Sequence, residues 1–204
     1  MILDERNLLE AVQILCELDA DLARAVRLYG PPPWWAREPG FATLVWIILE
    51  QQVSLASAKA TFSRLQATIP LTPQHFLTLD DATLKSIGFS RQKTAYVRHL
   101  SQEILNGFDL ESLYRLDDHE AKARLVKLKG IGNWTADVYL LMALRRPDAW
   151  PVGDLGLQVG MQELKGLLVR PAGKVLEALA EPWRPWRSAA ARIVWHSYLS
   201  RRSS

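Results

Sequence analysis

Apolar residues recur at intervals of three and four along almost the whole chain, and this spacing constrains the fold more than any other feature. It matches the 3.6-residue turn of an α-helix, whereas a half-buried strand would show strict alternation, which is hard to find here. Groups of proline, glycine and asparagine interrupt the pattern and mark the ends of segments. We therefore expect an all-α protein. The expected helices cover residues 4–15, 19–29, 42–51, 55–67, 80–86, 91–106, 118–127, 134–145, 155–167, 173–180 and 186–201.

The size and composition of the chain are those of a globular protein. Its 204 residues, 49% hydrophobic and 23% charged, suffice for one large core or two closely joined subdomains. No apolar run reaches the roughly 20 residues that a membrane span requires, so we expect no membrane partner. The first residues, MILDERNLLEAVQIL, carry acids early and lack the basic region of a secretory signal, which favours a cytoplasmic location (at the nucleoid in a bacterium). Cys16 is the only cysteine, which excludes a disulfide, a cysteine zinc site or a cysteine-bound iron–sulfur cluster within one chain.

Charge is distributed unevenly along the chain, although the net charge is only +3. Residues 1–60 hold five Lys and Arg against eight Asp and Glu, whereas residues 160–204 hold eight basic residues against three acids. A basic C-terminal segment is typical of a protein that binds a polyanion. A solvated helix face would give the same pattern, and charge alone does not choose between the two.

The stretch LKGIGNWTADVYLL, residues 128–141, has the strongest local signal. Gly130 and Gly132 bracket one apolar residue, which is typical of a turn with positive φ or with a close neighbour. Asn133 is a candidate N-cap for the helix that follows. Because the backbone N–H groups of such a turn and of the first helical turn point outward together, the motif predicts an anion site.

A second stretch, LKSIGFSRQKTAYV at residues 84–97, echoes this motif. Both contain Leu-Lys-x-Ile-Gly followed shortly by Thr-Ala, so each predicts a helix, a tight turn and a second helix. Ser86 stands where the other stretch has Gly130, so the first turn is less able to approach a ligand closely. We therefore expect the anion site at residues 128–136. Chance similarity between two amphipathic segments is the alternative for the echo.

Four segments occur in the order seen in one enzyme family. They are ILEQQVS at 48–54, LKGIGNWTA at 128–136, PVGDLGL at 151–157 and PWRSAAARIVW at 185–195. Together they resemble helix-hairpin-helix DNA glycosylases, and in particular the 3-methyladenine DNA glycosylase II branch, which removes alkylated bases. The resemblance runs from about residue 41 to residue 199.

The resemblance implies an architecture and a substrate. A helical barrel would occupy about residues 41–141, residues 1–40 and 142–204 would form a second helical subdomain, and the active site would lie in the cleft between them. The whole chain would act as one catalytic unit, a monomer that binds double-stranded DNA containing damaged bases. The protein would take part in base excision repair and flip the damaged nucleotide out of the duplex to reach its glycosidic bond.

Asp154 matches the catalytic aspartate of this family, which follows the second helix of the hairpin. Cleavage of the glycosidic bond builds positive charge on the sugar, and a carboxylate near that carbon stabilises the charge or deprotonates the attacking water. An N3- or N7-alkylated purine is already cationic and leaves as a neutral base, so one carboxylate suffices. A helix N-cap is the structural alternative for Asp154, and both roles can coexist.

The base pocket predicted from the resemblance contains Trp134 and Trp195, because aromatic faces attract and stack on a cationic base. Either tryptophan could instead belong to the core. Trp134 also stands where bifunctional members carry a nucleophilic lysine, which predicts a monofunctional hydrolase without AP-lyase activity. Val138 replaces a pocket tyrosine of some alkyl-base members, which leaves the lesion range open.

The remaining predicted contacts are with the DNA backbone and with the gap left by the flipped base. Gln52 would enter the stack, with Gln51 beside it bracing the loop, although Gln52 could also be an ordinary polar residue at a helix end. No cofactor is expected to be required, but hairpins of this family often bind Na⁺, K⁺ or Ca²⁺ through backbone carbonyls. The predicted phosphate-binding residues are Gly130, Ile131, Gly132 and Thr135, and the carbonyls for a cation are those of Val126, Leu128 and Ile131. Additional phosphate contacts could come from basic residues, each of which could instead be an ordinary surface charge: Arg91, Lys93, Lys127, Lys129, Arg187 and Arg192.

Two other functions fit part of the sequence. One is a glycosylase for another lesion class, such as deaminated or oxidised bases. The other is a helix-hairpin-helix module that binds DNA without catalysis. Asp154 separates the last from the enzymes, since a binding module needs no carboxylate facing the DNA.

Overall fold

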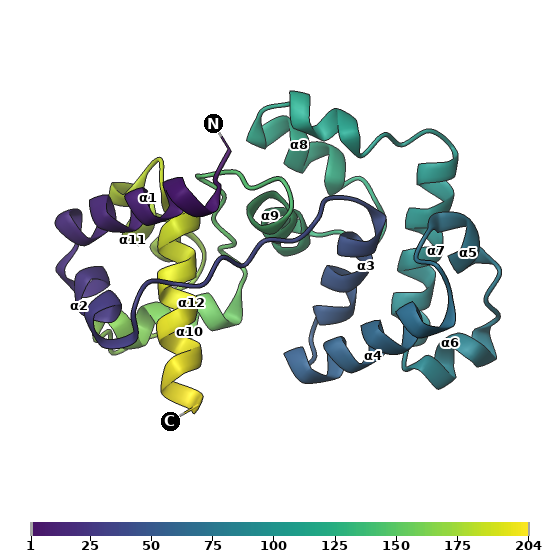
Figure 1. The fold of residues 1–204 in the computed structure, drawn as a ribbon, viewed down its shortest axis with the longest axis horizontal. Coiled ribbons are helices and arrows are strands. Elements are labelled where there is room, and N and C mark those ends of the chain that lie inside the picture. Colours follow the sequence, from purple (N-terminus) through teal and green to yellow (C-terminus); the bar gives the residue numbers. More distant parts are fainter. Residues whose placement is uncertain (1, 204) are drawn as a thin grey trace. The chain divides into compact units, whose positions relative to one another are not determined.

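The computed structural model describes residues 2–203, and every regular element in this range is a helix (Figure 1). The prediction of an all-α protein is therefore confirmed. All the expected helices are present within a few residues of their predicted ends. No helix among the described residues is both long and apolar enough to cross a membrane. Three short elements were not expected: α5 (Pro73–Leu77) and the 3-10 helices η1 (Glu111–Arg115) and η2 (Glu181–Trp183).

The chain divides into two compact units. The first unit contains residues 1–36 and 140–204, and the second contains residues 37–139. The boundary falls inside helix α9 (Asn133–Met142), which begins in the second unit and ends in the first.

The first unit is organised around its last helix, which is drawn in yellow in Figure 1. This helix, α12, packs against α1, α2 and α10. Its buried face carries small side chains, with Ala189, Ala190 and Ala191 fully buried, and this lets neighbouring helices approach closely. The helices of the unit are α1 (Glu5–Leu18), α2 (Ala20–Tyr29), α10 (Leu155–Lys165), α11 (Gly173–Ala180) and α12 (Arg187–Ser203).

The approach of α10 to α12 requires a glycine. A Cβ atom on Gly160 would lie 2.7 Å from Val194 Cγ1 and 3.2 Å from the Val194 carbonyl oxygen. Real Cβ atoms rarely come so close to backbone atoms, so any larger residue at position 160 would push the two helices apart. The position of α10 on α12 matters because Asp154 is the N-cap of α10.

The second unit is built around a buried apolar helix, α3 (Phe41–Glu50), which packs against α4 and α7. Most of its side chains are inaccessible to solvent, as expected for a helix that is hydrophobic on all sides. The rings of Phe41, Phe76 and Phe89 extend this core, with centroids 6.4 and 5.6 Å apart in sequence order. The other helices of the unit are α4 (Leu55–Thr68), α6 (Asp81–Ile87), α7 (Arg91–Leu105) and α8 (Asp118–Leu125), with α5 and η1.

The two echoing stretches both form helical hairpins, α6–α7 and α8–α9, but their turns differ. In the first, the Leu-Lys-Ser-Ile residues are helical and the chain reverses at Gly88, with φ +112°. In the second, α8 ends at Leu125, so Leu-Lys-Gly-Ile follows the helix and Gly130 has φ +87°. The positive φ therefore falls on different glycines of the motif, and the longer turn belongs to α8–α9.

Candidate functional site

The two glycines of the α8–α9 turn lie in different surroundings. Gly130 has positive φ, and a Cβ atom there would lie 2.2 Å from Cγ of Tyr96, whose ring packs against the turn. Gly132 has an ordinary φ, is exposed, and a Cβ atom there would meet no atom within 4 Å. The fold of the chain thus accounts for Gly130 and leaves Gly132 without an internal reason to be a glycine. Close approach by a ligand supplies such a reason.

The side chains beside Gly132 face inward. Ile131 is 3% exposed, and Thr135 is 2% exposed with its hydroxyl accepting a hydrogen bond from Gln51 Nε2 at 2.9 Å. If Thr135 or Ile131 contacts a phosphate, it therefore does so through its backbone and not through its side chain. The N–H groups at the start of a helix point outward along its axis, so the first turn of α9 offers donors of the kind that bind an anion.

The neighbouring residues Gln51 and Gln52 follow α3 and point to different environments. Gln52 is exposed and has φ +56°, one of two positive values among the described non-glycine residues. Gln51 turns inward, and its Nε2 donates to the Gly130 carbonyl oxygen and to Thr135 Oγ1, both at 2.9 Å. Gln51 is therefore held by the hairpin and Gln52 is its exposed neighbour, and the insertion of Gln52 into DNA stays a prediction.

Asp154 is both an N-cap and the acceptor of an indole N–H group. Its Oδ1 accepts from the backbone N–H of Leu157 at 2.7 Å and from Trp195 Nε1 at 2.9 Å. The side chain is half-buried, at the start of α10. Trp195 reaches it from α12, so these two predicted residues lie together in the first unit. The capping role expected as an alternative is present, and the site contains a carboxylate held from two sides.

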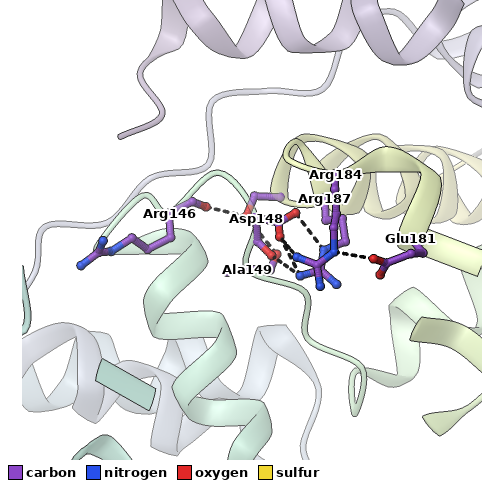
Figure 2. Close-up of polar contacts among 7 residues, drawn as sticks. Arg146, Asp148, Ala149, Glu181, Arg184 and Arg187 are labelled. Atoms are coloured by element: carbon purple, nitrogen blue, oxygen red, sulfur yellow. Dashed lines mark hydrogen bonds and ion pairs between the residues drawn. The ribbon is translucent and has the colours of Figure 1, made fainter. Parts of the chain in front are cut away.

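The loop that leads to Asp154 is clamped to the first turn of α12, as Figure 2 shows. Ser188 Oγ donates to the carbonyl oxygens of Arg146 and Ala149, at 2.6 and 2.9 Å. Asp148 receives Arg187 in a two-pronged pair, Nε–Oδ1 and Nη2–Oδ2, both 2.8 Å, and it also binds Arg184. Helix α12 therefore holds the loop through its first turn. Two turns later, its Trp195 holds the Asp154 carboxylate.

Three basic residues considered for phosphate contact bind other parts of the protein instead, and one of them is Lys93, which donates to the Leu49 carbonyl oxygen. Arg187 is committed to Asp148. Arg192 is 0% exposed, donates to the carbonyl oxygens of Ser188, Trp35 and Leu141, and lies 5.3 Å from the centroid of the Trp34 ring. Burial lowers the pKa of Arg192 to about 10. Its expected phosphate contact is wrong for this structure, because a long basic side chain in a periodic pattern does not reveal its direction.

The remaining pocket candidates lie on α9. Trp134 is half-buried, and Val138, one turn further along, is 5% exposed. Both belong to the second unit, whereas Asp154 and Trp195 belong to the first. The predicted site residues therefore form two sets: Asp154 with Trp195, and Gln51 with the turn at Gly130 and Thr135.

The family comparison covers the segments that carry this geometry. Residues 45–185 match the family described as HhH-GPD superfamily base excision DNA repair protein. This chain is an HhH-GPD superfamily member. The sequence resemblance to helix-hairpin-helix DNA glycosylases is thereby confirmed, and the matched segment of this HhH-GPD protein includes the hairpin and Asp154.

Named relatives and a solved structure agree with the family. DNA-3-methyladenine glycosylase 1 of Schizosaccharomyces pombe is 28% identical over 191 residues, which cover 89% of this chain and 83% of that protein. The solved structure of S. pombe 3-methyladenine DNA glycosylase (Mag1) in complex with abasic DNA matches with a TM-score of 0.84, covering 91% of this chain and 95% of that one, at 28% identity. A Bacillus subtilis protein, putative DNA-3-methyladenine glycosylase YfjP, is 32% identical over 126 residues; these are 61% of this HhH-GPD chain and 44% of the relative, so the match spans less than half of that protein.

Sequence reasoning missed Tyr96 and Ser188, which support the HhH-GPD hairpin and the Asp154 loop, and it considered Lys93 only for phosphate contact. Tyr96 packs on Gly130, Lys93 Nζ donates to the Leu49 carbonyl oxygen at 2.6 Å, and Ser188 joins α12 to the loop before Asp154. These contacts join distant parts of the chain. No local sequence pattern marks a tyrosine, a lysine or a serine on a helix as making such a contact. Gly130 alone indicated that another residue packs closely against the turn.

Proposed function

We propose that this HhH-GPD protein is a monofunctional DNA glycosylase that flips alkylated bases of the 3-methyladenine and 7-methylguanine type out of the duplex and hydrolyses their N-glycosidic bonds. The observation that carries the proposal is the Asp154 carboxylate, held by the Leu157 N–H and the Trp195 indole. The names of the S. pombe and B. subtilis relatives, both called DNA-3-methyladenine glycosylases, support the alkylated-base class.

The chemistry follows from the charge of the transition state. As the bond between the sugar and a cationic base breaks, the base leaves neutral and the sugar becomes oxocarbenium-like. A carboxylate already fixed in place stabilises that charge without reorganising, and it can accept a proton from the attacking water. The clamp of Ser188 and Arg187 on the preceding loop makes the carboxylate rigid at the backbone, and Trp195 does so at the side chain.

We expect no strand cleavage because of the residue at position 134. A lyase forms a Schiff base between a lysine amine and the sugar, and Trp134 has no amine. We therefore expect base release that leaves an intact strand with an abasic site. The indole instead contributes an aromatic face to the pocket, where it favours cationic bases.

The DNA contacts belong to the same proposal. The exposed Gly132 and the N–H groups at the start of α9 bind phosphates of the lesion strand, and Gln52 fills the gap in the stack. The carbonyls of Val126, Leu128 and Ile131 are oxygen donors suited to Na⁺, K⁺ or Ca²⁺, which would neutralise phosphate charge at the turn. The protein acts as a monomer and needs no other cofactor.

Incubation of purified protein with duplexes that each carry one lesion tests the function. Alkylated purines should be released as free bases, and the strand should break only after alkali is added. If only deaminated or oxidised bases are released, the protein is a glycosylase for that lesion class and not for alkylated bases. If the protein binds DNA tightly but releases no base, it is a binding module without catalysis. Trapping of a protein–DNA adduct with borohydride would contradict the monofunctional assignment.

The phosphate site has a matched pair of glycine variants. Gly132→Val meets open space in the free protein, so we expect it to fold and to weaken binding of damaged and undamaged DNA alike, because phosphate contacts carry no lesion information. It should also flatten the salt dependence of binding. Gly130→Ala should instead lower the melting temperature, because it collides with Tyr96. Unchanged affinity of folded Gly132→Val would move the phosphate site elsewhere.

A further inference from the structure

We propose that Gln51 is a positioning residue for extrusion of the damaged base: it fixes the loop of Gln52 to the phosphate-binding turn, so that insertion and backbone binding occur in register. The proposal rests on the proposed function. It assigns to Gln51 a step distinct from bond cleavage, which belongs to Asp154, and from stacking in the gap, which belongs to Gln52.

The first observation is the conformation of Gln52. Its φ of +56° lies in the left-handed region, which a side chain with a Cβ atom rarely adopts. Such a backbone conformation is strained and persists only where its surroundings hold it. The loop of residues 51–54, between α3 and α4, is therefore held in place by contacts outside itself.

Gln51 supplies these contacts toward the hairpin. Its amide nitrogen has two N–H groups, and both are used, one on the Gly130 carbonyl oxygen and one on Thr135 Oγ1. Gly130 lies in the turn and Thr135 in the first turn of α9, so one amide spans both parts of the predicted phosphate site. Thr135 is almost fully buried, which shields its bond from competing water.

Lys93 supplies a second contact, just before the loop. Its Nζ reaches from α7 to the Leu49 carbonyl oxygen, in the last turn of α3. A cation at the C-terminal end of a helix is favourable, and burial lowers the pKa of this lysine. The α6–α7 hairpin thus holds residue 49, and the α8–α9 hairpin holds residue 51. Gln52 is the exposed residue that follows these two fixed positions and precedes α4.

This arrangement has a kinetic consequence. When the turn binds the lesion strand, the position of Gln52 relative to the phosphates is already determined, and no loop search is needed before insertion. A misplacement of about 1 Å can cost about a hundredfold in rate. Loss of the brace should therefore slow extrusion, while affinity for DNA and cleavage of an extruded base should change little.

Gln51→Met tests this, because it keeps the length of the side chain and removes both donors. The substrates are one alkylated purine in a paired duplex and the same lesion in a single-nucleotide bulge, where extrusion is already favoured. We expect single-turnover base release to fall about 10–100-fold on the paired lesion and to change less than about threefold on the bulge. Gln102→Met, at an exposed position of α7, is the matched control and should behave as wild type.

A double variant distinguishes a positioning role from a structural one. If Gln51 acts through Gln52, adding Gln51→Met to Gln52→Ala should slow release on the paired lesion little further. Equal losses on paired and bulged lesions, an unchanged rate on the paired lesion, or additive losses in the double variant would each overturn the proposal. The fluorescence of 2-aminopurine beside the lesion reports extrusion without chemistry. If the wild type releases no alkylated base, the proposed function fails, and this signal still tests Gln51.

Discussion

Asp19 and Asp154 occupy equivalent local positions in the first unit. Each is the N-cap of a helix, Asp19 for α2 and Asp154 for α10. Each also accepts an indole N–H from a tryptophan distant in sequence, Trp183 at 3.0 Å and Trp195 at 2.9 Å.

The two carboxylates differ in which oxygen takes the indole and the capping N–H. Oδ2 of Asp19 takes both the Trp183 indole and Lys165 Nζ, the latter at 2.6 Å, while its Oδ1 caps the helix. At Asp154 the indole and the capping N–H converge on Oδ1, and both are neutral donors. Burial alone would raise the pKa of Asp19, but hydrogen bonds from Lys165 and Trp183 and the charge of Lys165 outweigh it and hold that pKa below its usual value.

The difference shows how one local device serves two purposes. An N-cap aspartate with an indole donor is a rigid carboxylate in both places. An ammonium beside it neutralises the charge and joins α2 to α10, which makes Asp19 part of the scaffold. At Asp154 the indole and the capping N–H share one oxygen, which fixes the carboxylate in a position suited to stabilise a cationic sugar.

The largest expected effect comes from the same substitution at the two sites. Asp154→Asn keeps the size and most of the capping ability but removes the charge. Base release should fall about 10²–10³-fold, the usual order for one preorganised electrostatic partner. Asp19→Asn should release bases at the wild-type rate per folded molecule and should lower the free energy of unfolding. Single-turnover base release and thermal unfolding of both variants make the measurement.

Binding data sharpen this contrast. Affinity of Asp154→Asn for lesion DNA should hold or rise, since a carboxylate near phosphates repels the duplex. The comparison breaks if Asp154→Asn keeps near-normal excision with a circular dichroism spectrum like that of the wild type. That result would remove Asp154 from the mechanism and reopen the choice of catalytic residue.

The tryptophans give the next largest contrast. Trp195→Phe keeps an aromatic face and removes the N–H donor to Asp154, and a hydrogen bond to a charged group is worth about 1.5–3 kcal/mol. We expect base release to slow about 10–100-fold with a small change in stability. Trp183→Phe should instead destabilise the fold by about 1–3 kcal/mol, because Trp183 is 1% exposed and packs on Trp150.

The double variant Trp195→Phe with Asp154→Asn decides how Trp195 acts. If the indole works through the carboxylate, the second substitution should add little to the first. Full additivity would indicate that Trp195 acts as a wall of the base pocket, as the sequence predicted.

Local signals in the sequence were sufficient for the helices and for the cap at Asp154, whereas Asn133, expected as an N-cap, is the first helical residue of α9. Apolar periodicity with intervening proline and glycine predicted the all-α fold, and the sequence around Asp154 allowed a cap there. The short α5, η1 and η2 were missed because they lie in segments rich in proline or in polar residues, where a single turn leaves no periodic pattern.

The partners of the candidate residues could not be predicted, because they depend on tertiary packing. Lys165 and Trp183 reach Asp19 from 146 and 164 residues away, and Trp195 reaches Asp154 from 41. Sequence reasoning assigned Trp195 to a pocket because an indole stacks well, and it did not anticipate its N–H bond. The two aspartates look alike in sequence, as caps before apolar helices, and only the fold brings the Lys165 ammonium to Asp19.

The smallest expected effect is in acid, where the ion pair of Asp19 should weaken. Because its pKa is lowered in the folded state, Asp19 contributes stability above its usual value of 3.8, and this contribution disappears as the pH falls through the folded-state pKa. The melting temperature of the wild type should exceed that of Asp19→Asn by about 2–6 °C at pH 7. This difference in melting temperature should stay constant down to about pH 4 and close below it.

Lys165→Met, which removes the partner of Asp19, should also differ from the wild type in melting temperature, and this difference should close over the same pH range. A gap that widens in acid, or one independent of pH, would mean that Asp19 is not stabilised as a charged group, and the contrast with Asp154 would lose its physical basis.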